Sequence, residues 1–151
     1  MIAITKPNSA VQTATITLKG DVAQVFACMC PVAEYHWVPG WETGKILSNS
    51  GLVEEGCVFT TPNDGNPATW IVTKHDAAER SLTMYKVVPD IVITRLDIDV
   101  VEADGGADAT ITYCHTALGP LGDDLVKGHS EDAYSETMAT WQSLINNYLA
   151  G

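Results

Sequence analysis

Four histidines are the side chains in this sequence best suited to acid–base or metal chemistry. They are His36, His75, His115 and His129. No two of them have the close spacing that preorganises a metal site, so tertiary contacts would have to assemble one. Surface or helix-capping roles are the simpler interpretation, and we expect neither a metal nor a cofactor.

His115 is the best single candidate for a catalytic residue. It shares strand parity with Ile111 and Tyr113. If that face points inward, the imidazole would lie in an apolar cavity, as a hydrogen-bonding anchor or a proton-transfer group. The alternative is a core histidine that is hydrogen-bonded to a tyrosine or a carbonyl. The sequence favours neither interpretation.

Other catalytic signatures are missing from the sequence. It contains no H-E-x-x-H, no C-x-x-C and no glycine-rich nucleotide loop. The segment GHSED begins like a nucleophile elbow, but Asp132 stands where the last glycine is required, and no strand precedes it. We therefore expect Ser130 to cap a helix.

Aromatic residues form the second group of candidates, and they indicate binding rather than a particular reaction. The stretch EYHWVPGW at 34–41 gathers three rings around a Pro39–Gly40 turn. Large rings usually fill a core, but buried Tyr and Trp need partners for their polar tips, which favours a cavity with a few polar anchors. With His115, the candidates for lining such a cavity are Trp37, Trp41, Phe59, Trp70, Tyr85, Tyr113, Met138 and Trp141.

The elements that must position these side chains follow from the spacing of apolar residues. Residues 11–18 alternate threonines with Ala, Ile and Leu, which predicts a half-buried strand. Asp21 is a good N-cap for a helix that ends near Met29. Pro31 stops that helix and can open a second short one, which ends at Pro39–Gly40.

Six short strands separated by turn residues come next, as in an antiparallel meander. Arg95, Asp97 and Asp99 alternate with apolar residues, so we expect one face of this sheet to meet water. The strands are predicted at residues 42–48, 57–61, 69–75, 81–88, 91–102 and 107–118.

The C-terminal segment returns to a helical period. Large apolar side chains recur at spacings of three and four from Tyr134 to Tyr148. This predicts a helix over residues 130–149. It is the only predicted helix long enough to cover the apolar face of the sheet.

Composition limits the remaining function classes. A chain of 151 residues that is 46% hydrophobic fits one globular domain, residues 1–151. The formal charge of −11 opposes binding to nucleic acid. We see no signal peptide and no apolar run for membrane insertion, and we expect the four cysteines to be reduced thiols in a cytoplasmic protein.

With these elements in this order, the sequence resembles the START-like, or SRPBCC, superfamily, which has the helix-grip fold. The segments that carry the resemblance are GDVAQVF, WVPGW, GCVFTT, TWIVTKHD, TYCHTAL and WQSLINNYLAG, spread from about Val11 to Gly151. The resemblance implies an α+β fold. A curved seven-stranded antiparallel sheet would wrap around the long C-terminal helix, with two short helices after the first strand. It also implies a hydrophobic cavity between sheet and helix.

The superfamily includes polyketide cyclases, lipid-transfer domains, the birch pollen allergen family and chaperone activators, so it implies no single activity. The leading hypothesis is transport, sequestration or sensing of a small hydrophobic or aromatic molecule. The first alternative is a cyclase- or dehydratase-like enzyme that uses His115 in the same cavity. The second is a protein-interaction domain with a closed core. Whether the chain forms a homodimer is left open.

The three hypotheses require different interiors. Binding and catalysis need a cavity of about a few hundred cubic ångströms, whereas an interaction domain needs a closed core and an exposed apolar patch. An enzyme further needs at least two titratable groups that converge inside the cavity. A single histidine among rings would favour binding.

Overall fold

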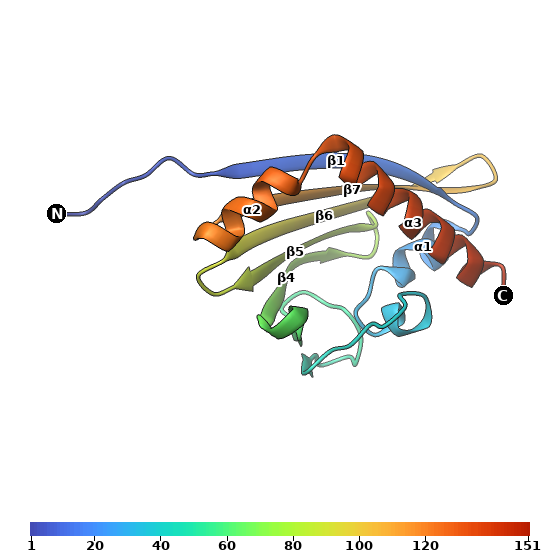
Figure 1. The fold of residues 1–151 in the computed structure, drawn as a ribbon. Helices are drawn as coiled ribbons and strands as arrows, with labels where there is room; N and C mark the ends of the chain where they lie inside the picture. Colours follow the sequence, from blue (N-terminus) through green and yellow to red (C-terminus); the bar gives the residue numbers. More distant parts are fainter.

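The computed structural model describes residues 1–151 and shows a single curved sheet with the helices gathered over one of its faces (Figure 1). The sheet has seven strands, each antiparallel to its neighbours, in the order β1-β7-β6-β5-β4-β3-β2. The strands are β1 (Ser9–Leu18), β2 (Ile46–Leu47), β3 (Val58–Thr61), β4 (Ala68–Asp76), β5 (Ser81–Val88), β6 (Val92–Ala103) and β7 (Gly106–Ala117). The sheet order confirms the predicted meander, with β1 returning to pair with β7.

Two short helices follow β1, as expected. The first is α1 (Val22–Cys28), and Asp21 starts it with a capping box. The Asp21 carboxylate accepts from the Gln24 backbone N–H at 2.8 Å, and the Gln24 side chain accepts from the Asp21 N–H at 3.1 Å. The second is a single 3₁₀ turn, η1 (Ala33–His36). A further 3₁₀ turn, η2 (Asn63–Gly65), separates β3 from β4.

Strand β2 is much shorter than the predicted strand at 42–48. Only Ile46 and Leu47 pair regularly with β3. Before them the ladder continues as separate bonds, because the Gly44 N–H donates to the Thr60 carbonyl and the Thr60 N–H donates to the Lys45 carbonyl. The sheet therefore ends in an irregular edge.

The sequence pattern did not predict helix α2 (Pro120–Gly128). The sequence indicates a turn at Gly119 and Pro120, whereas Pro120 is the first residue of the helix, a position where proline is common. Gly122 lets α2 pack closely on the sheet, because a Cβ at this position would collide with the Ile91 carbonyl oxygen.

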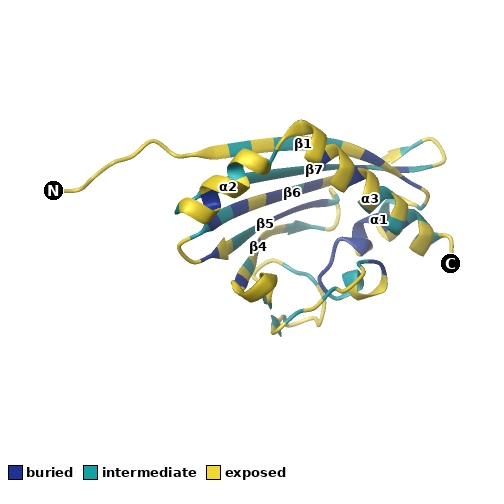
Figure 2. Cartoon of the chain, viewed as in Figure 1, coloured by how far each residue is buried: buried dark blue, intermediate teal, exposed yellow.

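Helix α3 (Glu131–Leu149) is the predicted C-terminal helix, and it crosses the concave face nearest to β1 (Figure 1). Its buried side chains are Tyr134, Met138 and Ile145. Figure 2 shows the pattern on the sheet, where buried and exposed positions alternate along the strands. No helix of the protein is both long and apolar enough to cross a membrane.

Polar side chains fix α3 to the edge of the sheet. Gln142 accepts from the Thr17 N–H at 2.9 Å, and Asn146 accepts from the Lys19 N–H at 2.8 Å. The Tyr134 hydroxyl donates to the Ile111 carbonyl at 2.7 Å. The bonds from Gln142 and Asn146 satisfy backbone groups at the end of β1 and just beyond it that have no strand partner on that side.

Substituting Ile145→Ala tests the role of α3 in the core. Ile145 has no exposed surface, so we expect the cavity left behind to lower the free energy of unfolding by about 2–5 kcal/mol. The matched control is Ile4→Ala, since Ile4 is 94% exposed. Urea denaturation of both variants checks this, and a similar loss in both would contradict it.

Candidate functional site

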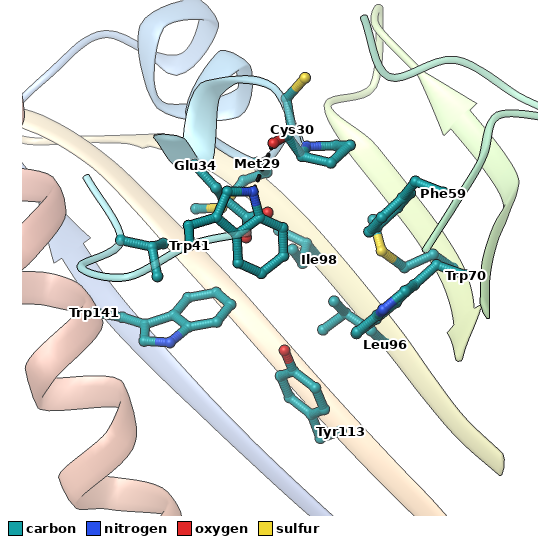
Figure 3. Close-up of a pocket in the computed structure, with 13 residues that line it drawn as sticks. Met29, Cys30, Glu34, Trp41, Phe59, Trp70, Leu96, Ile98, Tyr113 and Trp141 are labelled. Carbon is teal, nitrogen blue, oxygen red and sulfur yellow. Dashed lines mark hydrogen bonds between the residues drawn. The ribbon is translucent and has the colours of Figure 1, made fainter. Parts of the chain in front are cut away.

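A cavity of about 220 Å³ lies between the concave face of the sheet, helix α3 and the segment that follows α1 (Figure 3). Eleven of its thirteen lining residues are hydrophobic. Strands β3 to β7 contribute Phe59, Trp70, Met84, Leu96, Ile98 and Tyr113. Helix α3 contributes Trp141, and the rest are Met29, Cys30, Pro31, Glu34, Val38 and Trp41.

Five of the nine residues predicted to line a cavity do line it. Phe59 and Trp70 are cross-strand partners whose rings stack with their centroids 5.4 Å apart and their planes 6° apart. On the opposite side, Tyr113 and Trp141 meet edge to face at 6.3 Å and 85°. Trp41 enters from the segment after η1 (Figure 3). Alternation along the strands and the turn at Pro39–Gly40 thus bring together rings that are distant in sequence.

Hydrogen bonds hold the indole rings in fixed orientations. The Trp41 Nε1–H donates to the Pro31 carbonyl at 2.8 Å (Figure 3), and the Trp70 Nε1–H donates to the Thr61 hydroxyl at 3.1 Å. The Trp141 Nε1–H has no protein partner although the ring lines the cavity. Hydrogen bonds therefore fix two of the three indole rings that line the cavity.

Trp37 and Met138 belong to the core behind the cavity rather than to its wall. Both are almost fully buried, with exposed fractions of 5% and 2%. The Trp37 Nε1–H donates to the Cys28 carbonyl at 3.0 Å, and its ring packs against Trp141 at 5.5 Å and 72°. Trp37 therefore supports Trp141 from behind.

Tyr85 lies on the outer face of the sheet, so the expectation that it lines the cavity is wrong. Its neighbour Met84 faces the cavity, and alternation turns Tyr85 to the other side. There its ring packs under the Arg95 guanidinium, 5.8 Å from the ring centroid. Arg95 also pairs with Asp97 at 2.9 Å. The polar face predicted around Arg95 is thus the face that carries Tyr85.

His115 points to the inner side of the sheet but lies outside the main cavity. It lines a neighbouring recess of about 260 Å³ together with His129 and Tyr134. Tyr113 and Trp141 line both spaces, so these two rings form the wall between them.

The surroundings of His115 resemble those of a core histidine. Its Nδ1 is hydrogen-bonded to the buried Thr94 hydroxyl at 2.6 Å, and its ring packs edge to face on His129 at 4.5 Å. Burial lowers the pKa of His115 to about 4, with further contributions from His129 and Lys86. The imidazole is therefore uncharged at neutral pH and is poorly matched to proton transfer near pH 7.

Glu34 is a cavity residue that the sequence reasoning did not select. Its carboxyl group reaches into the space between the rings (Figure 3) and makes no hydrogen bond or ion pair with any protein group. Burial raises the pKa of Glu34 to about 8. Its spacing of three and seven residues from Trp37 and Trp41 is the signal that could have indicated it.

The Tyr113 hydroxyl shares this cavity with Glu34 (Figure 3). It likewise has no protein hydrogen-bond partner, and burial, followed by the nearby Glu34 charge, raises the pKa of Tyr113. Two titratable groups therefore face the same apolar space. Both are free to bond to a guest molecule.

The burial of Glu34 predicts an unusual dependence of stability on pH. Between about pH 4.5 and 8, the folded protein holds a proton on Glu34 that the unfolded chain has lost. The free energy of unfolding should therefore fall as the pH rises through this range, by up to about 1 kcal/mol per pH unit.

Urea denaturation of the wild type and Glu34→Gln from pH 5 to 8 measures this contribution. The variant should gain stability relative to the wild type as the pH rises. His115 works in the opposite direction from about pH 4 to 6.5, because its pKa is lowered, but both proteins contain it and its contribution cancels. A difference that does not change with pH would show that Glu34 is not buried in this way.

No protein-family model and no curated protein sequence matches the chain. Solved structures match it over nearly its full length. Ara h 8.0201 is 14% identical to this chain, and its structure matches with a TM-score of 0.66. The match covers 95% of this chain and 99% of Ara h 8.0201. Norcoclaurine synthase from Thalictrum flavum is 12% identical to this chain and was solved in complex with dopamine and hydroxybenzaldehyde. It matches with a TM-score of 0.67 over 99% of this chain and 95% of the synthase chain.

An uncharacterised protein from Rhizobium leguminosarum is also similar, at 14% identity and a TM-score of 0.66 over 98% of this chain and 99% of that one. At these identities the similarity concerns the fold and not the activity. It confirms the expected fold: a curved seven-stranded antiparallel sheet with a long C-terminal helix on its concave face, the helix-grip fold.

Proposed function

We propose that this protein binds a small hydrophobic or aromatic molecule between the sheet and helix α3, for transport, sequestration or sensing. The observation that carries the proposal is the cavity of about 220 Å³ with its wall of fixed rings. An apolar protein cavity of about 150 Å³ holds benzene. The cavity therefore suits one ring with a short substituent.

Polar groups inside the cavity support an oriented guest. The Glu34 carboxyl, the Tyr113 hydroxyl and the Trp141 N–H all lack protein partners. A few polar groups among apolar walls are typical of small-molecule sites. A protein of the same fold was solved with dopamine and hydroxybenzaldehyde, which supports the capacity of this fold for aromatic guests.

We also propose that the protein acts in the cytoplasm. Its four cysteines are unpaired, and three of them are buried. Reduced thiols are typical of that compartment.

The cavity does not fit the closed core that an interaction domain of the chaperone-activator type would need.

Filling the cavity tests the binding function. Leu96→Trp should place a ring in the cavity and weaken binding of 2-phenylethanol at least tenfold, whereas Val87→Trp on the outer face should leave it unchanged. Isothermal titration calorimetry measures both affinities. If the wild type binds neither 2-phenylethanol nor other single-ring compounds, the proposed function is wrong.

An acid–base enzyme is the second candidate function, and the pairing of Glu34 with Tyr113 in one cavity favours it. Burial raises the pKa of Glu34 to about 8, so above that pH its carboxylate is a stronger base than an ordinary glutamate and could remove a proton from the carbon beside a bound carbonyl group, while the Tyr113 hydroxyl bonds to the carbonyl oxygen. The catalytic role would then fall to Glu34 and Tyr113. His115, which lies in the neighbouring recess, would not take part.

Proton exchange on a bound ketone tests this second candidate. In deuterated buffer, the Glu34 carboxylate would remove an α-proton from 1-phenyl-2-propanone, and the carbon would take a deuteron back. NMR should show faster exchange with the wild type near pH 8.5 than near pH 6.5, and Glu34→Gln should abolish the acceleration. Exchange at the rate of buffer alone would exclude this candidate and leave the binding function standing.

A further inference from the structure

The unpaired carboxyl group of Glu34 sets the electrostatic character of the cavity. No Lys, Arg or His is among the thirteen lining residues, and no protein group donates a hydrogen bond to the carboxyl. Trp41, Tyr113 and Trp141 line the same space. The cavity thus combines one acidic group with several aromatic rings and contains no basic group.

A carboxylate in such a place is poorly stabilised when the cavity is empty. Glu34 is half-buried, so the charge loses much of the water that would solvate it, and no protein donor or cation replaces that water. The carboxyl group can remain protonated and uncharged, or it can ionise and pair with a guest molecule that carries a positive charge. Only the second response makes use of the charge.

We propose that Glu34 makes the cavity selective for small organic cations, namely a single-ring amine or quaternary ammonium whose charge is held between the Glu34 carboxylate and the surrounding rings. This inference rests on the proposed binding function and adds the charge class of the guest. The rings contribute because the negative face of an aromatic ring attracts a cation, most strongly when both are out of water. The overall charge of −11 adds a long-range attraction for cations.

Anions and uncharged guests fit the same walls less well. An anion would face both the carboxylate and the negative ring faces. An uncharged guest could bond to Glu34 in its protonated form, but it would gain nothing from the negative charge or from the ring faces. The distinction between guests of equal shape is therefore electrostatic.

Few other titratable groups face Glu34. Cys30 lies in the segment that follows α1, and Tyr113 faces Glu34 from β7. The strands β3 to β6 and helix α3 present only uncharged residues to the cavity. Lys86 lies on the inner face 5.3 Å from the Trp70 ring centroid, but it does not line the cavity, and burial lowers its pKa.

A matched pair of ligands tests the inference. Benzyltrimethylammonium carries a permanent charge, and neopentylbenzene has the same shape with carbon in place of nitrogen. Quenching of tryptophan fluorescence, excited at 295 nm, reports binding of both. At pH 8.5 we expect the ammonium compound to bind at least tenfold more tightly than the hydrocarbon.

The pH dependence of the two affinities should also differ. The empty protein holds a proton on Glu34 below about pH 8, and a bound cation must displace that proton. Affinity for benzyltrimethylammonium should therefore rise at least tenfold from pH 6 to pH 8.5. The ligand itself does not titrate, so the change belongs to the protein. Affinity for neopentylbenzene should stay constant.

Two variants assign the effect to Glu34. Glu34→Gln keeps the shape of the side chain and should lower the affinity for the ammonium compound at least tenfold and remove its pH dependence. The same variant should leave binding of neopentylbenzene within twofold of the wild type. Glu42→Gln removes a charge from an exposed position and should change neither affinity.

Each other outcome overturns the inference in a recognisable way. Equal binding of both ligands, or binding of the hydrocarbon alone, refutes the selectivity and leaves the proposed binding function intact. Equal losses for both ligands in Glu34→Gln mean that Glu34 only shapes the cavity. If neither ligand binds the wild type, the selectivity fails, and failure of 2-phenylethanol as well would refute the binding function itself.

Discussion

One helix cannot cover the whole concave face of a seven-stranded sheet, and this geometric constraint underlies the cavity. Helix α3 lies nearest to β1, where Gln142 and Asn146 bond to the edge strand. The concave face of strands β3 to β6 lies farther from helix α3 and is covered by residues 29–41. The space between these two covers is where the rings meet. A wider helical layer would have filled it with side chains.

The short segment at 34–41 therefore has two structural tasks. Trp37 is buried and supports Trp141, whereas Trp41 lines the cavity with its N–H bonded to the Pro31 carbonyl. Glu34 enters the cavity from the same segment. The packing of the core and the shape of the cavity thus depend on the same residues, because the bonds that fix the indoles also fix the segment that carries the carboxyl.

The regular elements could be predicted from the sequence, because apolar spacing is a direct consequence of a buried face. Strand β5 was predicted at 81–88, and α3 was predicted within one residue of its bounds. Helix α2 was missed because Pro120 can either end a turn or begin a helix. Strand β2 was predicted too long because its residues bond to β3 without regular alternation.

The site was predictable only where strand parity decided the outcome. Parity places Phe59, Trp70 and Tyr113 on the inner face of the sheet. In β5 both faces carry large side chains, so parity cannot tell which face is inward, and Tyr85 was therefore assigned to the wrong face. His115 has the expected parity, yet β7 is long enough to carry it past the cavity into the next recess. Glu34 was missed because it lies in the single 3₁₀ turn η1, which is too short to show a periodic pattern.

The position of Glu34 also links stability to the proposed charge selectivity in physical terms. The burial that raises its pKa disfavours the ionised folded protein when the cavity is empty. The same low-polarity surroundings strengthen its attraction to an opposite charge, since Coulomb energy rises as the effective dielectric constant falls. A group that weakens the empty protein above neutral pH is thus the group best placed to discriminate by charge among guests. Rings alone would discriminate chiefly by shape.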